Sequence, residues 1–178
     1  MIHNKDRSGW IGASDTSFVM GNWSTATWAN WWAEKLGIHS NHFDTIYTKT
    51  GTWYEGKVLD ALGVKKRDRQ ILIPKYRLRV NLDGETWKIH EIKTHKDPEF
   101  KVSKAYWQQA QVEMFAAKKP LEIVAYHLTD DDYTNWFNPI DPERLTHHPI
   151  EWDGEWIGCK YLPRLMILSE CLKKGVWP

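Results

Sequence analysis

The spacing of apolar residues predicts three helices in the first third of the chain. Apolar side chains recur there at intervals of three and four, which places them on one face of a helix. Serine, threonine or aspartate precedes the first two segments, and glycine follows all three, as at many helix ends. The predicted helices are Thr16–Met20, a second from the Ser24–Thr25 cap to Leu36, and a third from about Thr52 to Leu62.

The middle of the chain changes to an alternation of period two. Leu78, Val80 and Leu82 alternate with polar residues, which predicts a half-buried strand. Asp83–Glu85 is typical of a turn, so Trp87–Thr94 is predicted as the return strand of a hairpin.

Helical and strand patterns alternate in the remaining half. The expected elements are a helix over Ser103–Lys118, a buried strand over Leu121–Leu128, a solvated turn at Asp130–Asp132, and a helical region over Gly154–Lys174 that is interrupted at Pro163.

Length and charge narrow the possible classes of protein. The 178 residues predict one domain over 1–178. With 24 Lys and Arg against 23 Asp and Glu, the net charge is +1, which excludes a wholly basic coat protein and an acidic disordered chain. No apolar run is long enough for a membrane span or a signal peptide, so we expect a cytoplasmic protein. Two cysteines cannot hold a four-thiolate iron–sulfur cluster.

Tryptophan is unusually frequent, with 12 residues. Unpaired nucleic-acid bases stack on such rings. Trp28, Trp31 and Trp32, however, recur at helical spacing, which favours packing in the core.

The predicted hairpin carries the sharpest chemical signal. Glu91 and Lys93 are two positions apart on a strand and therefore share a face, and a short turn would bring Asp83 beside them. Two adjacent carboxylates repel each other unless a cation lies between them, and their hard oxygen atoms suit Mg²⁺ or Mn²⁺. Such a metal polarises a phosphate and lowers the pKa of bound water, while a nearby lysine stabilises the developing charge. The pattern indicates phosphodiester hydrolysis, although the same residues also occur on solvated hairpins.

Other residues match this chemistry. Glu55 lies in the middle of a predicted helix and could reach the same centre, and Gln109 lies on the helix after the hairpin. Arg7 and Ser14, next to a predicted helix N-terminus, are suited to bind phosphate. A zinc site is disfavoured because His90 and His95 have the wrong spacing for H-E-x-x-H and lie on a strand.

The ordered motifs resemble the YqaJ-like viral recombinase family, the phage alkaline exonucleases related to lambda exonuclease within the PD-(D/E)XK nuclease superfamily. The segments that carry this resemblance are Arg7–Ser14, Gly51–Glu55, Leu82–Gly84, Glu91–Lys93 and Ala105–Gln111, in the family's order.

The resemblance implies a metal centre. Asp83, Glu91 and the backbone carbonyl of Ile92 would bind the metal, and Glu55 would support a second ion through water. The expected cofactor is Mg²⁺, two ions per site, with Mn²⁺ as a substitute.

The resemblance also implies roles for the surrounding residues. Lys93 would activate or position the attacking water, and Gln109 would hold the water or the lysine. Arg7 and Ser14 would bind a phosphate of the DNA end.

The family's fold is α/β with a restriction-endonuclease-like core, a small mixed sheet flanked by helices. Its members digest the 5′-ended strand of linear double-stranded DNA for single-strand-annealing recombination. The resemblance therefore implies double-stranded DNA ends as substrate, a ring-shaped homotrimer, a single-strand annealing protein as partner and, for a bacteriophage protein, the host cytoplasm.

Two other functions stay open from the sequence. One is a structure-specific or restriction-like endonuclease, which would also cut closed circular DNA. The other is a non-catalytic DNA-binding module, which the complete set of motif residues disfavours.

Overall fold

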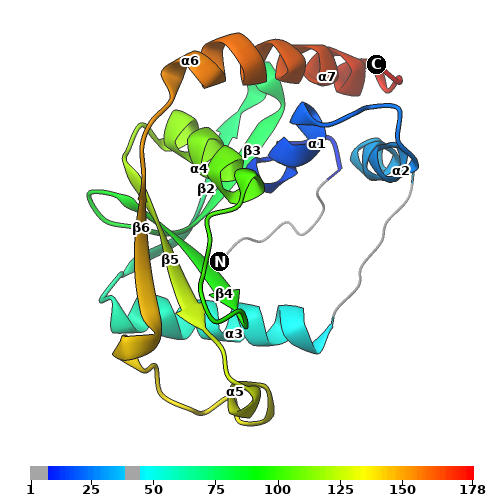
Figure 1. Ribbon diagram of the computed structural model, residues 1–178. Coiled ribbons are helices and arrows are strands. Elements are labelled where there is room, and N and C mark those ends of the chain that lie inside the picture. The colour runs from blue at the N-terminus through cyan, green and yellow to red at the C-terminus, as the bar shows by residue number, and fades with distance from the viewer. Residues whose placement is uncertain (1–7, 39–44) are drawn as a thin grey trace.

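A mixed six-stranded sheet forms the centre of the molecule (Figure 1). The structure is a computed structural model that describes residues 8–38 and 45–178. The strand order is β1-β3-β4-β5-β6, with β2 paired to β3; β1–β3 and β4–β5 are parallel, and the other pairs are antiparallel. The strands are β1 (Ile11–Gly12), β2 (Lys66–Ile73), β3 (Leu78–Glu85), β4 (Ile89–His95), β5 (Leu121–His127) and β6 (Leu145–Ile150).

Helices cover both faces of this sheet, so the expected α/β fold with a small mixed sheet is confirmed (Figure 1). Helix α3 crosses one face, whereas α1, α4 and α7 lie on the other side. The helices are α1 (Thr16–Met20), α2 (Ala26–Lys35), α3 (Ile46–Ala61), α4 (Lys104–Ala117), α5 (Asp130–Thr134), α6 (Gly154–Trp156) and α7 (Leu162–Lys174), with short 3₁₀ turns at Ala13–Asp15, Pro74–Tyr76 and Pro142–Arg144 and a π turn at Ile157–Tyr161.

Two hydrophobic cores form because both faces of the sheet are covered. The larger core joins α1, α2, α4 and α7 to the sheet, and it includes Trp28, Trp31 and Trp32, each at most 6% exposed. The packing role predicted for these three tryptophans is therefore confirmed. The smaller core lies under α3, where Tyr54 and Val58 meet Ile92 and Tyr126.

Strand β3 is shared by three neighbours. Strand β2 pairs with it along its whole length, from Ile73 opposite Leu78 to Lys66 opposite Glu85. The other edge of β3 therefore pairs with β1 near Leu78 and with β4 only at Gly84 and Glu85. On the N-terminal side of Gly84 the strands β3 and β4 are no longer paired, so Asp83 lies in a fork between them.

The predicted hairpin is displaced by a few residues. Asp83–Glu85 belongs to β3 rather than to a turn, and the chain reverses at Thr86–Lys88. A Cβ atom at Gly84 would lie 2.5 Å from Leu59 Cδ2, so the glycine allows α3 to approach the sheet. Tertiary packing thus places these residues in a strand, although their local sequence resembles a turn.

Other local predictions differ from the structure as well. Asp130–Asp132 forms the start of α5 instead of a solvated turn, and Asp132 is fully buried. Pro163 lies just after the π turn Ile157–Tyr161 inside a continuous helical run from Gly154 to Lys174, so it does not interrupt this helical region. Helix α3 starts at Ile46, before the predicted Thr52, and is capped by Thr45. No helix in the described part of the chain is both long and apolar enough to span a membrane.

Candidate active site

Glu91 and Lys93 project from β4 toward α4, as their spacing on a strand predicts. Lys93 Nζ lies 2.6 Å from Glu91 Oε1. Gln109 of α4 donates from Nε2 to the same Glu91 oxygen at 2.7 Å, and its Oε1 lies 3.4 Å from Lys93 Nζ. The glutamine therefore joins both side chains to the helix.

Asp83 lies in the fork between β3 and β4. Its Oδ2 accepts a hydrogen bond from the backbone N–H of Ile92 at 2.9 Å, next to Glu91. Burial, followed by the negative charges of Glu91 and Glu55, raises the pKa of Asp83 well above its usual range. The charge of Glu91 is thus close enough to oppose the ionisation of Asp83.

Glu55 faces the same centre from α3. Burial, then the charge of Glu91 and that of Asp68, raises the pKa of Glu55 to about 7. Asp68 lies in β2 with a left-handed φ of 52°, which is uncommon for a residue other than glycine.

Glu113 is a fourth acidic residue at this site, and the sequence analysis did not identify it. It is 0% exposed, and its Oε1 accepts a hydrogen bond from Gln109 Nε2 at 2.8 Å. Burial, then the charges of Glu91 and Asp83, raises the pKa of Glu113 well above its usual range. The available signal was its position four residues after Gln109, which puts both side chains on one helix face.

We call the carboxyl groups of Asp83, Glu55, Glu91 and Glu113 the acidic cluster. The positive charge of Lys93 only partly balances the negative charge of this cluster. Burial opposes its positive charge, but Glu91 outweighs this effect and raises the pKa of Lys93, which stays protonated. The site therefore holds more negative than positive groups when its carboxyls ionise.

The acidic cluster fits a divalent cation by the chemistry of its donors. The Oε2 atoms of Glu91 and Glu113 are buried and have no hydrogen-bond partner among the described residues. Such oxygen atoms retain capacity to accept a hard cation. Within residues 8–38 and 45–178, however, no three His, Cys, Asp or Glu side chains already form a complete ligand set. Backbone oxygen or water would have to contribute.

Cavities open on two sides of the acidic cluster. A small cavity of about 160 Å³ is lined by Asp83, Gln109 and Glu113 together with Ser14. A groove of about 440 Å³ is lined by Glu55 and Lys93. The expected phosphate residue Ser14 therefore shares a cavity with Asp83, whereas Arg7 lies outside the described residues.

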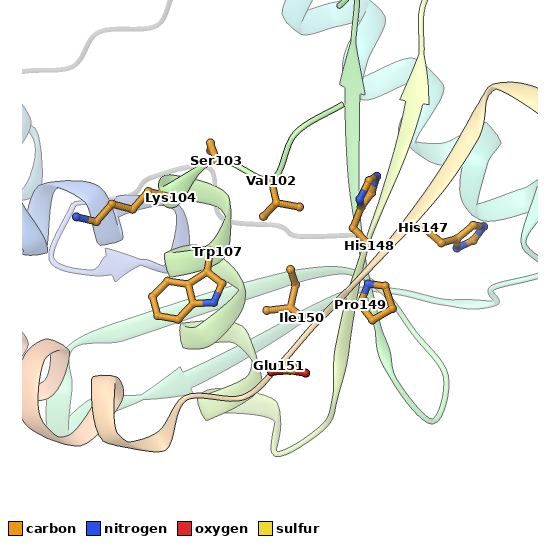
Figure 2. A pocket seen from close by; sticks show the side chains of 9 residues that line it. All are labelled: Val102, Ser103, Lys104, Trp107, His147, His148, Pro149, Ile150 and Glu151. Carbon is orange, nitrogen blue, oxygen red and sulfur yellow. The ribbon is translucent and has the colours of Figure 1, made fainter. Parts of the chain in front are cut away.

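A third cavity, of about 560 Å³, lies apart from the acidic cluster. Figure 2 shows Val102 on the chain that leads into α4 and Pro149 and Ile150 on β6, while Lys104 and His147 project to opposite sides. Since this cavity lacks converging titratable groups, it does not define the reactive centre.

A known structure shares this architecture. An alkaline exonuclease, LHK-Exo from Laribacter hongkongensis, superposes with a TM-score of 0.68 at 18% sequence identity, over 94% of this chain and 90% of that one. The chain has the fold of an alkaline exonuclease. The structure of SSO0001 matches with a TM-score of 0.48 and 11% identity, over 98% of this chain and 78% of that one. Neither protein-family models nor curated protein sequences give a match.

Within this exonuclease fold, the structure separates the glutamines of α4. Gln109 contacts the acidic cluster. Gln111 instead donates to the Glu151 carbonyl at 2.7 Å and accepts from the Asp153 N–H at 2.8 Å. Gln111 therefore ties α4 to the chain after β6.

The segment that carries Ser14 is held by Asp15. One Asp15 oxygen accepts from the Gly12 N–H at 2.7 Å and pairs with Lys35 Nζ at 2.5 Å. The other accepts from Trp31 Nε1 at 3.0 Å. Helix α2 thus fixes this wall of the small cavity in the exonuclease fold.

Proposed function

We propose that the chain is a metal-dependent deoxyribonuclease, a phage-type alkaline exonuclease that degrades the 5′-ended strand of linear double-stranded DNA. The observation that carries this proposal is the acidic cluster beside Lys93, at the centre of an alkaline exonuclease fold. Buried carboxylates that raise one another's pKa are costly to a fold, which is expected at a functional site.

Asp83, Glu91 and the Ile92 carbonyl would hold Mg²⁺, for which Mn²⁺ would substitute. Glu55 would support a second ion through water. When bound, the metal would polarise the scissile phosphate and acidify a water molecule. The unpartnered Oε2 of Glu91 and the shared rise in the pKa values of Asp83 and Glu55 support this assignment.

The protein's own groups would orient the reactants. Lys93 is held by Glu91 and by Gln109, so its ammonium group would have a fixed position beside the phosphate. As a cation it would position the attacking water and stabilise developing negative charge, rather than remove a proton. Gln109 would keep Glu91 and Lys93 in place.

The remaining details of the proposal follow from the family resemblance. Ser14, in the cavity next to Asp83, and Arg7 would bind a phosphate at the DNA end. A homotrimeric ring would enclose the duplex, and a single-strand annealing protein would receive the exposed strand during recombination in the cytoplasm of a phage host.

A digestion assay tests the proposal. Linear duplex DNA, labelled separately at each end and carrying a 5′-phosphate or a 5′-hydroxyl, is incubated with Mg²⁺, Mn²⁺ or EDTA beside a closed circle. Metal-dependent loss of the 5′-ended strand with an intact circle is expected. Cutting of the circle would instead indicate an endonuclease, and no cutting by folded protein with either metal would leave a DNA-binding module.

A further inference from the structure

The groove of about 440 Å³ beside the acidic cluster, here called the tyrosine groove, extends from Glu55 and Lys93 to aromatic residues that have no role in the chemistry described so far. Tyr47, Gly51 and Glu55 line it from α3 at intervals of four residues, so they share one helix face. Lys93 lines it from β4. Its volume lies in the range of small-ligand sites, and it opens directly onto the proposed reactive centre.

Aromatic rings form the outer end of this groove. Tyr47 of α3 and Tyr133 of α5 meet edge to face, with ring centroids 5.4 Å apart. Tyr47 is 61% exposed, so this large ring remains available to a ligand. Lys96 Nζ lies 4.8 Å from the centre of the Tyr133 ring and 2.7 Å from Asp130, and its side chain is 46% exposed. An aromatic surface and a solvent-exposed positive charge therefore lie side by side.

A third tyrosine lies at the inner end of the groove. Lys93 Nζ is 4.9 Å from the centre of the Tyr106 ring, and this ring stacks on Phe100 with centroids 5.9 Å apart. Between the two ends, a Cβ atom at Gly51 would lie 3.1 Å from Thr94 Oγ1. The helix can pass this close to β4 because residue 51 has no side chain.

This combination of groups selects a particular chemical class of ligand. Tyrosine faces stack with flat aromatic groups, and lysine binds phosphate. In a duplex the faces of the bases are already stacked on one another, so exposed rings recognise unpaired bases. A ligand with alternating bases and phosphates satisfies both the tyrosines and Lys96.

We propose that the tyrosine groove binds single-stranded DNA next to the phosphate that is cleaved, with a base on Tyr47 and Tyr133 and a phosphate on Lys96. This inference rests on the proposed function for the cleavage step, but binding can be measured without cleavage. The groove would hold the separated strand in line with Lys93.

Fluorescence anisotropy with a labelled oligothymidylate in EDTA tests the proposal. Tyr47→Ala should weaken binding about tenfold, the loss typical of one base–aromatic stack, while Tyr47→Phe retains the ring and should bind as wild type. Lys96→Ala should reduce the slope of log affinity against log salt by about 0.7. Trp87→Ala is the control, because Trp87 is 73% exposed at the opposite end of β4.

The outcomes distinguish this inference from the proposed function. Weaker binding by Tyr47→Ala but not by Tyr47→Phe or Trp87→Ala supports the groove, whether or not the wild type cleaves DNA. Binding by Tyr47→Ala and Lys96→Ala equal to that of the wild type overturns it, even when cleavage is normal. A wild-type protein that does not bind the oligonucleotide, or a Trp87→Ala variant that loses as much affinity, also overturns it.

Discussion

Gln109 Nε2 lies 2.7 Å from Glu91 Oε1, and this hydrogen bond joins α4 to β4. The same amide nitrogen lies 2.8 Å from Glu113 Oε1, so one glutamine connects two buried carboxylates. An amide can donate to both without adding charge to a site that already holds excess negative groups. Gln109 therefore positions the acidic cluster at small electrostatic cost.

Substitution of the central residues should abolish cleavage without unfolding the protein. Asp83→Ala, Glu91→Ala and Lys93→Ala each remove a group proposed to hold metal or stabilise the phosphate, so the rate should fall by at least about 100-fold. End-labelled duplex digestion measures the rate, and circular dichroism checks the fold. Glu99→Ala, in which an exposed acid is lost, should cleave normally. Full activity in any central variant would contradict the assigned site.

Divalent metal should stabilise the folded protein through Asp83. At about 100 times its Kd, bound Mg²⁺ or Mn²⁺ adds about 2.7 kcal/mol to the free energy of unfolding. Asp83→Asn should raise the melting temperature of the metal-free protein, because burial and neighbouring charges disfavour the ionised carboxyl. The same substitution should reduce the increase in melting temperature that metal causes. Thermal melts in EDTA and in metal test this. Asp97→Asn, at an exposed position, should respond to metal as the wild type does.

Glu55 should make the metal-free protein less stable as pH rises toward 7. Its folded-state pKa of about 7 exceeds the unfolded value of about 4.3, so the folded state binds more protons between these values. The contribution of Glu55 to the free energy of unfolding is therefore fully present below about pH 4 and is lost as pH rises through 7. Urea midpoints between pH 5 and 7.5, in EDTA, should fall less steeply for Glu55→Gln than for the wild type. Equal slopes would refute this, and Glu155→Gln at an exposed site is the control.

Asp132 should contribute strongly to stability. It accepts hydrogen bonds from Tyr54 Oη at 2.8 Å and from Arg144 Nη1 at 2.6 Å. Burial opposes its charge, but Arg144, Thr129 and Tyr54 outweigh burial and hold the pKa of Asp132 below its usual range. Asp132→Asn removes the closer anionic partner of Arg144, leaves the more distant Asp141 at 3.6 Å, and should cost about 3 kcal/mol in chemical denaturation.

Asp131→Asn is the matched control for Asp132, because the neighbouring side chain is exposed and bonds only at the surface. A similar loss in both variants would mean that α5 as a whole, rather than the Asp132 pair, determines stability.

The central motif was predictable because strand and helix periodicity act locally. Glu91 and Lys93 share a face by their spacing alone, and Gln109 lies on a regular helix whose N-cap, Ser103, accepts a hydrogen bond from the Tyr106 N–H. The fold class was instead inferred from the resemblance of the ordered motifs to a known nuclease family.

Features set by distant partners could not be predicted in this way. Asp132 is buried where it bonds to Tyr54, 78 residues away in the sequence, and to Arg144, 12 residues away. Gly84 belongs to a strand because α3 packs on it, although Asp-Gly resembles a turn. Glu113 occurs among buried residues of α4, where an acidic residue is not expected unless it is paired.

The short strand β1 has a consequence for the order in which the chain folds. Ile11 and Gly12 pair in parallel with Leu78 and Arg79, which the ribosome adds much later. Contacts between such distant segments form slowly, because a long loop must close first. The wall that carries Ser14 is therefore synthesised first but docks late, and α4 with Gln109 follows later still. A nascent chain would thus have no reactive centre until most of the protein had emerged and folded.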